Sequence, residues 1–258
     1  TLRPDVVGFF DPATHTVTAN VHPIRPRMSP PWARPVEGRI LGSPAVTRGT
    51  AVVTAAESER DQRRAAAALA ARGLEAGDRV ALVAAGGPAY LAGALGALRT
   101  GIIPVLINTH LLPAEQDVLL ADARPSLVLR DGELDALVAD GAPHPEVALA
   151  PAPLGRPMIY TSGTTGQPKG VWSGVLDDED AAALLAEERD QWGFRADDVH
   201  LVSSPLHHSA PLRFAAGTLL VGGTVVLPGH FTAGGFGTAV TAHPPTPAFP
   251  APAHLQRL

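Results

Sequence analysis

The feature that most constrains the fold is a regular alternation of helical segments with short apolar runs, which begins near Val46. Residues 57–73 predict an alanine-rich helix that ends at Gly73, and residues 77–85 predict a turn and a buried strand. The alternation continues through a helix at 88–101, a strand at 103–108, a helix at 113–123, a strand at 126–130 and a helix at 133–140. Because right-handed crossovers of this kind join parallel strands, the pattern predicts an α/β fold.

A proline-rich stretch from Pro143 to Pro157 interrupts the alternation, and we place a subdomain boundary there. Beyond it we expect a strand at 157–161, a helix near 177–192, strands at 199–204 and 224–227, and a short final helix at 253–258. The prediction is therefore two mostly parallel β-sheet subdomains flanked by helices, at residues 39–155 and 156–258. Residues 1–38 are expected to be an extension, in which a β-like alternation through Val21 precedes a proline-rich linker.

Composition excludes several classes of protein. With 45% apolar and 17% charged residues, the 258-residue chain is not a disordered polyelectrolyte, and a net charge of −5 argues against nucleic-acid binding. The absence of cysteine excludes disulfides, thiolate metal sites and a cysteine nucleophile. The first residues lack a basic region followed by a long apolar run, so we expect no targeting segment in them and a cytoplasmic protein.

One segment requires a membrane test, because residues 214–242 contain no Asp, Glu, Lys or Arg. A spanning helix needs about 20 mostly apolar residues. Repeated glycines, Pro228 and the β-branched cluster at 224–227 interrupt this segment. It is therefore expected to form buried strand and helix pieces, with no transmembrane span.

The loop at residues 160–170, YTSGTTGQPKG, carries the strongest functional signal. It follows a predicted strand and contains three glycines, four Ser or Thr hydroxyls and Lys169, the only lysine of the chain. Glycines allow close backbone approach to a ligand, successive amides bind anions, and a lysine ammonium suits phosphate. We therefore predict a loop that binds a polyphosphate. It is not the usual P-loop, which needs Gly-Lys followed by Ser or Thr, because Lys169 lies between Pro168 and Gly170.

Residues 160–171 resemble the signature loop of the AMP-forming acyl-CoA synthetase family, whose relatives include peptide-synthetase adenylation domains and luciferases. The likeness covers about residues 46–258 and includes the segment PLHHSAPLRF at 205–214. It implies the N-terminal portion of that fold. The implied reaction uses ATP to convert a carboxylic acid into an acyl-adenylate and then transfers the acyl group to coenzyme A. We expect a fatty or other apolar acid, because residues 205–220 are largely apolar.

The resemblance also implies roles for individual residues. Lys169 and His208 would be catalytic, and His207 and His208 would contact the acyl substrate. Thr161 would help to hold Mg²⁺. The residues implied to bind the ATP phosphates are Thr161, Ser162, Gly163, Thr164, Thr165, Gly166 and Lys169.

A metal site at the histidine pair, a serine hydrolase and a catalytic acidic run are weaker interpretations of the sequence. Two adjacent histidines on a strand would point to opposite faces, which makes a shared metal site between His207 and His208 unattractive; a structural role for His208 stays open. Nearby serines suggest a hydrolase, but no Gly-x-Ser-x-Gly turn occurs. The acidic run at 177–180 is typical of a helix N-terminus.

Three motifs of the family do not occur in these 258 residues. They are the aromatic-Gly-x-Thr-Glu motif, the Thr-Gly-Asp stretch and a C-terminal lysine. We therefore expect that these residues alone do not complete adenylation. Two alternatives remain open: a non-catalytic nucleotide-binding or interaction module derived from such an enzyme, and a fragment of a peptide-synthetase adenylation domain. An incomplete sheet also predicts self-association through an exposed edge.

Overall fold

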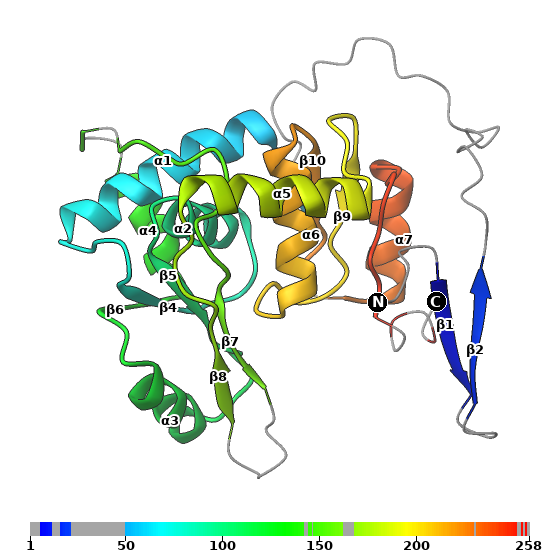
Figure 1. The fold of residues 1–258 in the computed structure, drawn as a ribbon, viewed down its shortest axis with the longest axis horizontal. Coiled ribbons are helices and arrows are strands. Elements are labelled where there is room, and N and C mark those ends of the chain that lie inside the picture. The colour runs from blue at the N-terminus through cyan, green and yellow to red at the C-terminus, as the bar shows by residue number, and fades with distance from the viewer. Residues whose placement is uncertain are drawn as a thin grey trace. The chain divides into compact units, whose positions relative to one another are not determined.

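The structure is a computed structural model that describes residues 6–11, 16–21, 50–141, 144–145, 147–161, 168–229, 231–251, 254 and 256. The chain divides into two compact units, Thr1–Ser43 and Pro44–Leu258. In the first unit, β1 (Val6–Asp11) pairs antiparallel with β2 (Thr16–Val21) (Figure 1). The strand expected near Val21 is therefore confirmed, and its partner β1 was not predicted. The proline-rich linker lies outside the described residues.

The second unit contains two sheets. The larger has the strand order β6-β4-β5-β7-β8, with β8 antiparallel to β7 and the other pairs parallel. Its strands are β4 (Arg79–Val83), β5 (Ile103–Leu106), β6 (Leu127–Arg130), β7 (Met158–Thr161) and β8 (Lys169–Val171). The smaller has the order β3-β10-β9, with β9 (Val199–Leu201) parallel and β3 (Ala51–Thr54) antiparallel to β10 (Thr224–Leu227). The predicted α/β class is confirmed.

The two sheets do not divide at residues 155 and 156, where the sequence placed a boundary. Strands β7 and β8 follow that point but complete the larger sheet, whereas β3 precedes it and joins the smaller one. Both sheets lie in the single compact unit Pro44–Leu258. Parallel pairing of β7 with β5 explains this arrangement, because it ties the chain after the proline-rich stretch to the sheet formed before it.

Helices lie between the two sheets and also on their outer faces. The helices are α1 (Ala55–Ala71), α2 (Pro88–Leu98), α3 (Pro113–Ala123), α4 (Glu133–Asp140), α5 (Asp178–Trp192), α6 (Ser209–Leu220) and α7 (Ala233–Ala242) (Figure 1). On β4, Val80 and Leu82 join the core formed with α1, α2, α4 and α6, whereas Ala81 and Val83 pack with α3. On β10, alternate residues likewise join this central core and the cluster with α7. This period of two is that of strands buried on both faces.

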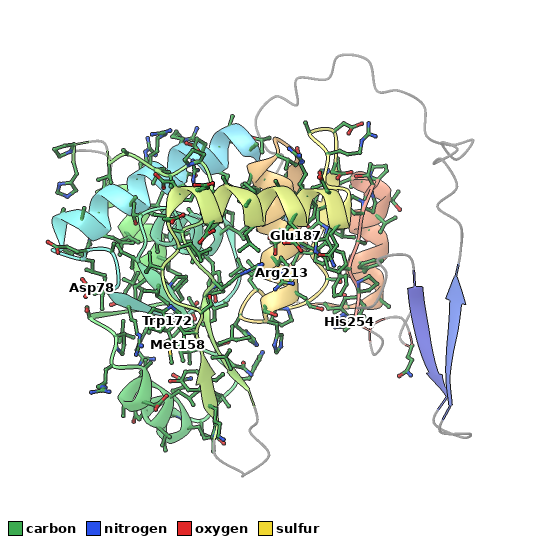
Figure 2. All side chains as sticks on the ribbon, viewed as in Figure 1. Asp78, Met158, Trp172, Glu187, Arg213 and His254 are labelled. Carbon is green, nitrogen blue, oxygen red and sulfur yellow. The ribbon has the colours of Figure 1, made fainter. Side chains whose placement is uncertain are left out.

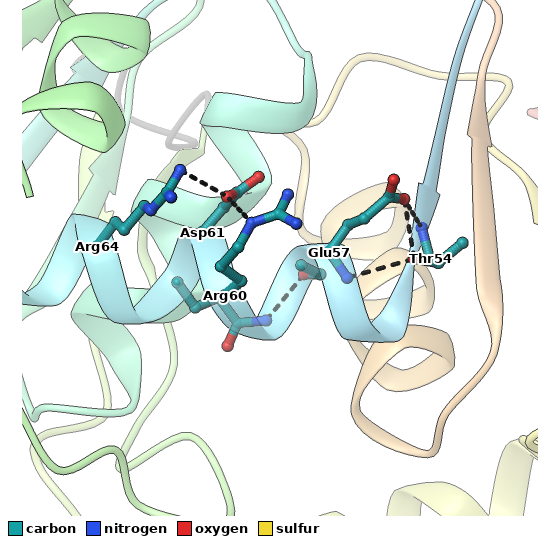
Figure 3. A network of polar contacts seen from close by, with 7 residues as sticks. Thr54, Glu57, Arg60, Asp61 and Arg64 are labelled. Carbon is teal, nitrogen blue, oxygen red and sulfur yellow. Dashed lines mark hydrogen bonds and ion pairs between the residues drawn. The ribbon is translucent and has the colours of Figure 1, made fainter. Parts of the chain in front are cut away.

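Helix α1 begins two residues earlier than predicted because Thr54 caps it. The Thr54 Oγ1 accepts a hydrogen bond from the Glu57 amide at 3.2 Å, and the Thr54 amide donates to Glu57 Oε2 at 3.1 Å (Figure 3). This reciprocal capping box satisfies two amides that the helix start leaves free. It therefore fixes the point where β3 passes into α1.

The segment tested for membrane spanning forms helix and strand pieces as expected, but only α6 and β10 are largely buried, whereas α7 buries Ala239 alone. Residues 214–242 contain most of α6, all of β10 and α7. Among the described residues, no helix has both the length and the apolar character needed to cross a membrane. The predicted final helix at 253–258 lies mostly outside the described residues.

Strand β8 is at an edge of the larger sheet. Beside it, Val171, Trp172 and Val175 are exposed at 53%, 40% and 43%. The guanidinium of Arg79 lies 5.1 Å from the Trp172 ring centroid and covers one face of it. An exposed edge with apolar side chains fits the expected self-association, which stays a prediction.

The buried histidine of β9 predicts a pH-dependent stability. His200 stacks on Phe214 with ring centroids 6.0 Å apart, and burial lowers the His200 pKa from about 6.5 to about 4. Protons therefore bind more readily to the unfolded chain between these values. The free energy of unfolding is expected to be largest above about pH 6.5 and to fall by about 3 kcal/mol as the pH decreases to about 4.

Urea unfolding of the wild type and of His200→Gln at about pH 7.5 and 4.5 checks this. Because half-buried His207 and the carboxylates titrate in both proteins, the difference between the two pH dependences reports His200 alone. An equal loss of stability in the two proteins would contradict the assignment.

Candidate functional site

The glycine- and threonine-rich loop connects two paired strands at the edge of the larger sheet. Thr161 on β7 is opposite Lys169 on β8, and Tyr160 is opposite Gly170. The Lys169 side chain is exposed. The predicted phosphate-binding residues Ser162, Gly163, Thr164, Thr165 and Gly166 lie outside the described residues, as does the Thr161 side chain. The backbone at Thr161 and Lys169 thus fixes both ends of the loop.

Tyr160 attaches the base of this hairpin to helix α3. Its hydroxyl donates to Asp122 Oδ2 at 2.6 Å, and it also lies 3.0 Å from the carbonyl oxygen of Leu119. Burial, followed by the hydrogen bond to the Asp122 carboxylate, raises the pKa of the Tyr160 phenol above its ordinary value. The hydroxyl therefore stays protonated and keeps donating throughout the physiological pH range.

Close packing favours a glycine at position 170. A Cβ atom there would come within 2.2 Å of the Met158 Cε and 3.2 Å of the Tyr160 ring. Met158 on β7 and Trp172, the residue after β8, are both labelled in Figure 2. Because Met158 Cε is the end of a flexible side chain that can move aside, contact between the strands favours a glycine at position 170 without requiring it.

The histidine pair lies in a turn before α6, so the strand geometry that was used to argue against a shared metal site does not apply to it. Strand β9 ends at Leu201, and Pro205 begins the turn, so the chain no longer alternates sides. The His207 and His208 rings lie 4.3 Å apart between centroids, and His208 is the residue that precedes the first turn of α6. The two rings are therefore neighbours on one side of the chain.

His207 is half-buried and His208 is exposed. Burial is the first cause that lowers the His207 pKa to about 4, and the positive charges of His208 and His110 add to it. His207 is therefore neutral near pH 7. In that state it offers one hydrogen-bond donor and one acceptor rather than a positive charge.

A cavity of about 240 Å³, called the α5–α6 cavity below, lies between the β7–β8 hairpin and the two helices α5 and α6. Ile159 and Val171 line it from β7 and β8, and Ser209, the residue after His208, lines it from the start of α6. Leu184 and Leu185 line it from α5, so most of its wall is apolar. The structure thus brings the hairpin and the start of α6 to one cavity; neither predicted histidine lines it, and only His208 is adjacent in sequence to a lining residue, Ser209.

The residues that make this cavity polar were not identified from the sequence. Arg156, Glu188 and Arg213 come from the segment before β7, from α5 and from α6, and form a shared ion-pair cluster. Of these, only Arg213 had a signal in the sequence, as the one charged residue in the otherwise apolar helix Ser209–Leu220. Asp122 was also missed, because its contact with Tyr160 joins elements 38 residues apart.

The acidic run starts α5, as predicted. Asp177 precedes the helix, and its Oδ1 accepts a hydrogen bond from the Asp180 amide at 2.8 Å. Within the described part of the chain, no group of three or more His, Asp or Glu side chains could hold a metal ion. These acidic residues therefore have a structural explanation.

A family model described as AMP-binding enzyme matches residues 34–154 and 156–258. Feruloyl-CoA synthase from an Amycolatopsis species is 32% identical over 235 residues, covering 83% of this chain. The chain spans 46% of that relative's length.

Solved structures show the same fold. MenE, the o-succinylbenzoate CoA synthetase of Bacillus subtilis, was solved with the acyl-adenylate intermediate OSB-AMP. It superposes with a TM-score of 0.66 at 24% identity, covering 78% of this chain and 56% of MenE. ATP-bound MatB from Rhodopseudomonas palustris superposes with a TM-score of 0.58 at 26% identity, covering 73% of this chain and 42% of MatB.

The two tyrosines of the chain provide a matched test of the hairpin's attachment. Tyr160→Phe removes a hydroxyl with two partners and is expected to lower the free energy of unfolding by about 1 kcal/mol. The buried Tyr90 hydroxyl has no hydrogen-bond partner among the described residues, so Tyr90→Phe is expected to leave stability unchanged or to raise it. Urea unfolding measures both. An equal loss of stability in the two variants would contradict the anchoring role of Tyr160.

Proposed function

Because the chain belongs to the AMP-binding enzyme family, we propose that it is the phosphate-gripping part of an acid–thiol ligase. The proposed reaction activates a carboxylic acid with ATP and then forms a thioester with coenzyme A. The chain spans about half the length of the curated relative it matches, so this activity is proposed for the whole protein.

The observation that supports this proposal is the β7–β8 hairpin with its exposed lysine. The Lys169 ammonium stands at one end of a loop of glycines and hydroxyls, and the strand pairing to Thr161 fixes the other end. Backbone amides and a point charge held at the mouth of a loop suit the phosphates of ATP. MatB, at 26% identity, is one structural neighbour that was solved with ATP bound.

The chemistry requires charge stabilisation rather than a protein nucleophile. A carboxylate oxygen of the acid forms a bond to the α-phosphorus of ATP, while the bond to the β-phosphate breaks and pyrophosphate leaves. The thiol of coenzyme A then attacks the acyl carbonyl carbon and AMP leaves. Lys169 would stabilise the negative charge that develops on the phosphates during the first step.

His207 and His208 would act at the acyl group. Ser209, next to His208, lines the α5–α6 cavity, so an acid in that cavity would have its carboxylate near the turn. The lowered pKa of His207 keeps this ring neutral, and a neutral ring can donate a hydrogen bond to the substrate carboxylate without trapping it as an ion pair. We assign His208 the same contact from its exposed position.

The acyl group is proposed to be apolar and compact. The cavity wall is mostly apolar, and its volume of about 240 Å³ is below the roughly 300–1,000 Å³ of ordinary ligand pockets. A single aromatic ring or a short chain suits this volume better than a long fatty chain. The relative named for a feruloyl group agrees with this choice.

Mg²⁺ is assigned a ligand from this chain, whereas coenzyme A is proposed from the names of the relatives. Mg²⁺ would balance the phosphate charge of ATP, with Thr161 as its one assigned ligand from this chain. The described residues do not supply a cluster that would complete such a site, so no step is derived through the metal. Coenzyme A is the acceptor thiol named in the relatives.

Two alternatives predict different behaviour of the natural protein. A non-catalytic module would bind ATP and fail in carboxylate-dependent ATP–pyrophosphate exchange at its natural length. A peptide-synthetase adenylation fragment would catalyse the exchange and deliver the acyl group to a carrier protein instead of coenzyme A. The proposed ligase catalyses both exchange and coenzyme A thioester formation.

Replacing Lys169, the only lysine of the chain, tests whether its ammonium group binds the phosphates of ATP. Lys169→Ala is expected to weaken ATP binding by about ten- to a hundredfold, because one charged contact to phosphate is lost. Lys169→Arg keeps the charge and is expected to retain part of the affinity. Isothermal titration calorimetry with ATP measures each dissociation constant, and unfolding curves confirm that the variants fold. Unchanged ATP affinity in Lys169→Ala would refute the assignment.

A further inference from the structure

An aromatic side chain forms part of the wall of the α5–α6 cavity. Among the described residues that line this cavity, Trp172 is the one aromatic residue. It directly follows β8 and lines the cavity from the hairpin side, whereas Leu184 and Leu185 line it from α5 (Figure 2). The Trp172 residue is also 40% exposed, so core packing does not enclose its ring. A ligand that enters the cavity can therefore reach the indole.

Two contacts hold the indole ring in place from outside the cavity. The guanidinium of Arg79 lies over one face of the Trp172 ring, 5.1 Å from its centroid. Arg79 Nη1 also donates a hydrogen bond to the carbonyl oxygen of Ala123 at 2.8 Å, which fixes the guanidinium itself. Arg79 does not line the cavity. The cavity therefore borders the part of the indole that Arg79 leaves uncovered, and the cation–π contact orients the ring before any ligand binds.

The space beside Trp172 has room for a flat apolar ring. The cavity volume is about 240 Å³, and an apolar cavity of about 150 Å³ is large enough to bind benzene. From the helix side, Ala181 on α5 and Ala216 on α6 contribute small side chains that leave this space open. A ring in this space would lie between the indole and the apolar side chains of the two helices.

Volume alone does not distinguish an aromatic ring from an aliphatic group, but an indole does. Hydrophobic burial increases with apolar area, and a cyclohexyl ring buries at least as much apolar area as a phenyl ring. Offset-stacked or edge-to-face contact between two aromatic rings adds an electrostatic attraction that a saturated ring does not have. An aromatic wall in an otherwise aliphatic cavity therefore favours an aromatic ligand.

We propose that Trp172 is a specificity-determining residue that makes the acyl site select aromatic over aliphatic carboxylic acids. This inference rests on the proposed function, because it takes the α5–α6 cavity as the acyl site. Ser209 lines the same cavity at the start of α6. An acid with its carboxylate near the His207–His208 turn therefore directs its ring into the space that Trp172 lines.

The test compares benzoate with cyclohexanecarboxylate, two acids with the same number of carbon atoms. Their dissociation constants are measured by isothermal titration calorimetry on one sample of the full chain. The wild type is expected to bind benzoate about three- to tenfold more tightly, as an aromatic pair provides beyond its buried area. Trp172→Leu is expected to remove this preference, and Trp172→Phe to retain part of it. Because the preference is a ratio within one sample, partial loss of folding does not mimic the result.

Trp192→Leu is the matched control. Trp192 is also 40% exposed and packs on Phe214 with ring centroids 5.1 Å apart, but it does not line the cavity. This variant should keep the wild-type preference. Equal binding of the two acids, tighter binding of cyclohexanecarboxylate, or a preference that survives in Trp172→Leu or disappears in Trp192→Leu would overturn the role of Trp172 and leave the proposed function standing.

Binding of neither acid would show that the cavity is not the acyl site, and the inference would fall. Titration of the same sample with ATP then distinguishes the two proposals. If ATP binds, the phosphate-binding part of the proposed function stands without this acyl site. If ATP does not bind either, the proposed function falls as well.

Discussion

The pairing of β8 with β7 is the constraint on which the rest of the site depends. This antiparallel pair is added to an otherwise parallel sheet, and it holds Thr161 opposite Lys169. The hydrogen bond from Tyr160 to Asp122 then attaches the same strand to α3. The two strands and that helix therefore place the described ends of the glycine- and threonine-rich segment, Thr161 and Lys169.

The central helices connect this hairpin to the rest of the unit. Ala215 and Leu219 of α6 belong to the central core, whereas Ser209 and Arg213 of the same helix line the cavity. One helix therefore packs between the sheets and forms a wall of the candidate acyl site. Because cores are close-packed, this arrangement gives the cavity a rigid side. The polar pair Glu188 and Arg213 is held on that side by two helices that contact each other.

Local sequence signals account for much of the fold and for part of the site. Helices α3 and α4 were predicted to the residue, because Pro113 and the acidic residues of their first turns mark their starts. Strand β3 was missed, since four residues carry little periodicity and its pairing with β10 is distant in sequence. The same reason hid Asp122 and Glu188, whose importance comes only from contacts across the fold. Strand geometry was applied to the histidine pair because the turn that begins at Pro205 was not recognised.

A crystal structure of the protein with ATP and 4-hydroxybenzoate tests the central claim most directly. The account predicts phosphate density against the loop between Thr161 and Lys169, with the lysine ammonium within hydrogen-bond distance of a phosphate oxygen. It also predicts the acid in the α5–α6 cavity, with its carboxylate toward the His207–His208 turn. Nucleotide bound elsewhere, with Lys169 still turned to solvent, would contradict it.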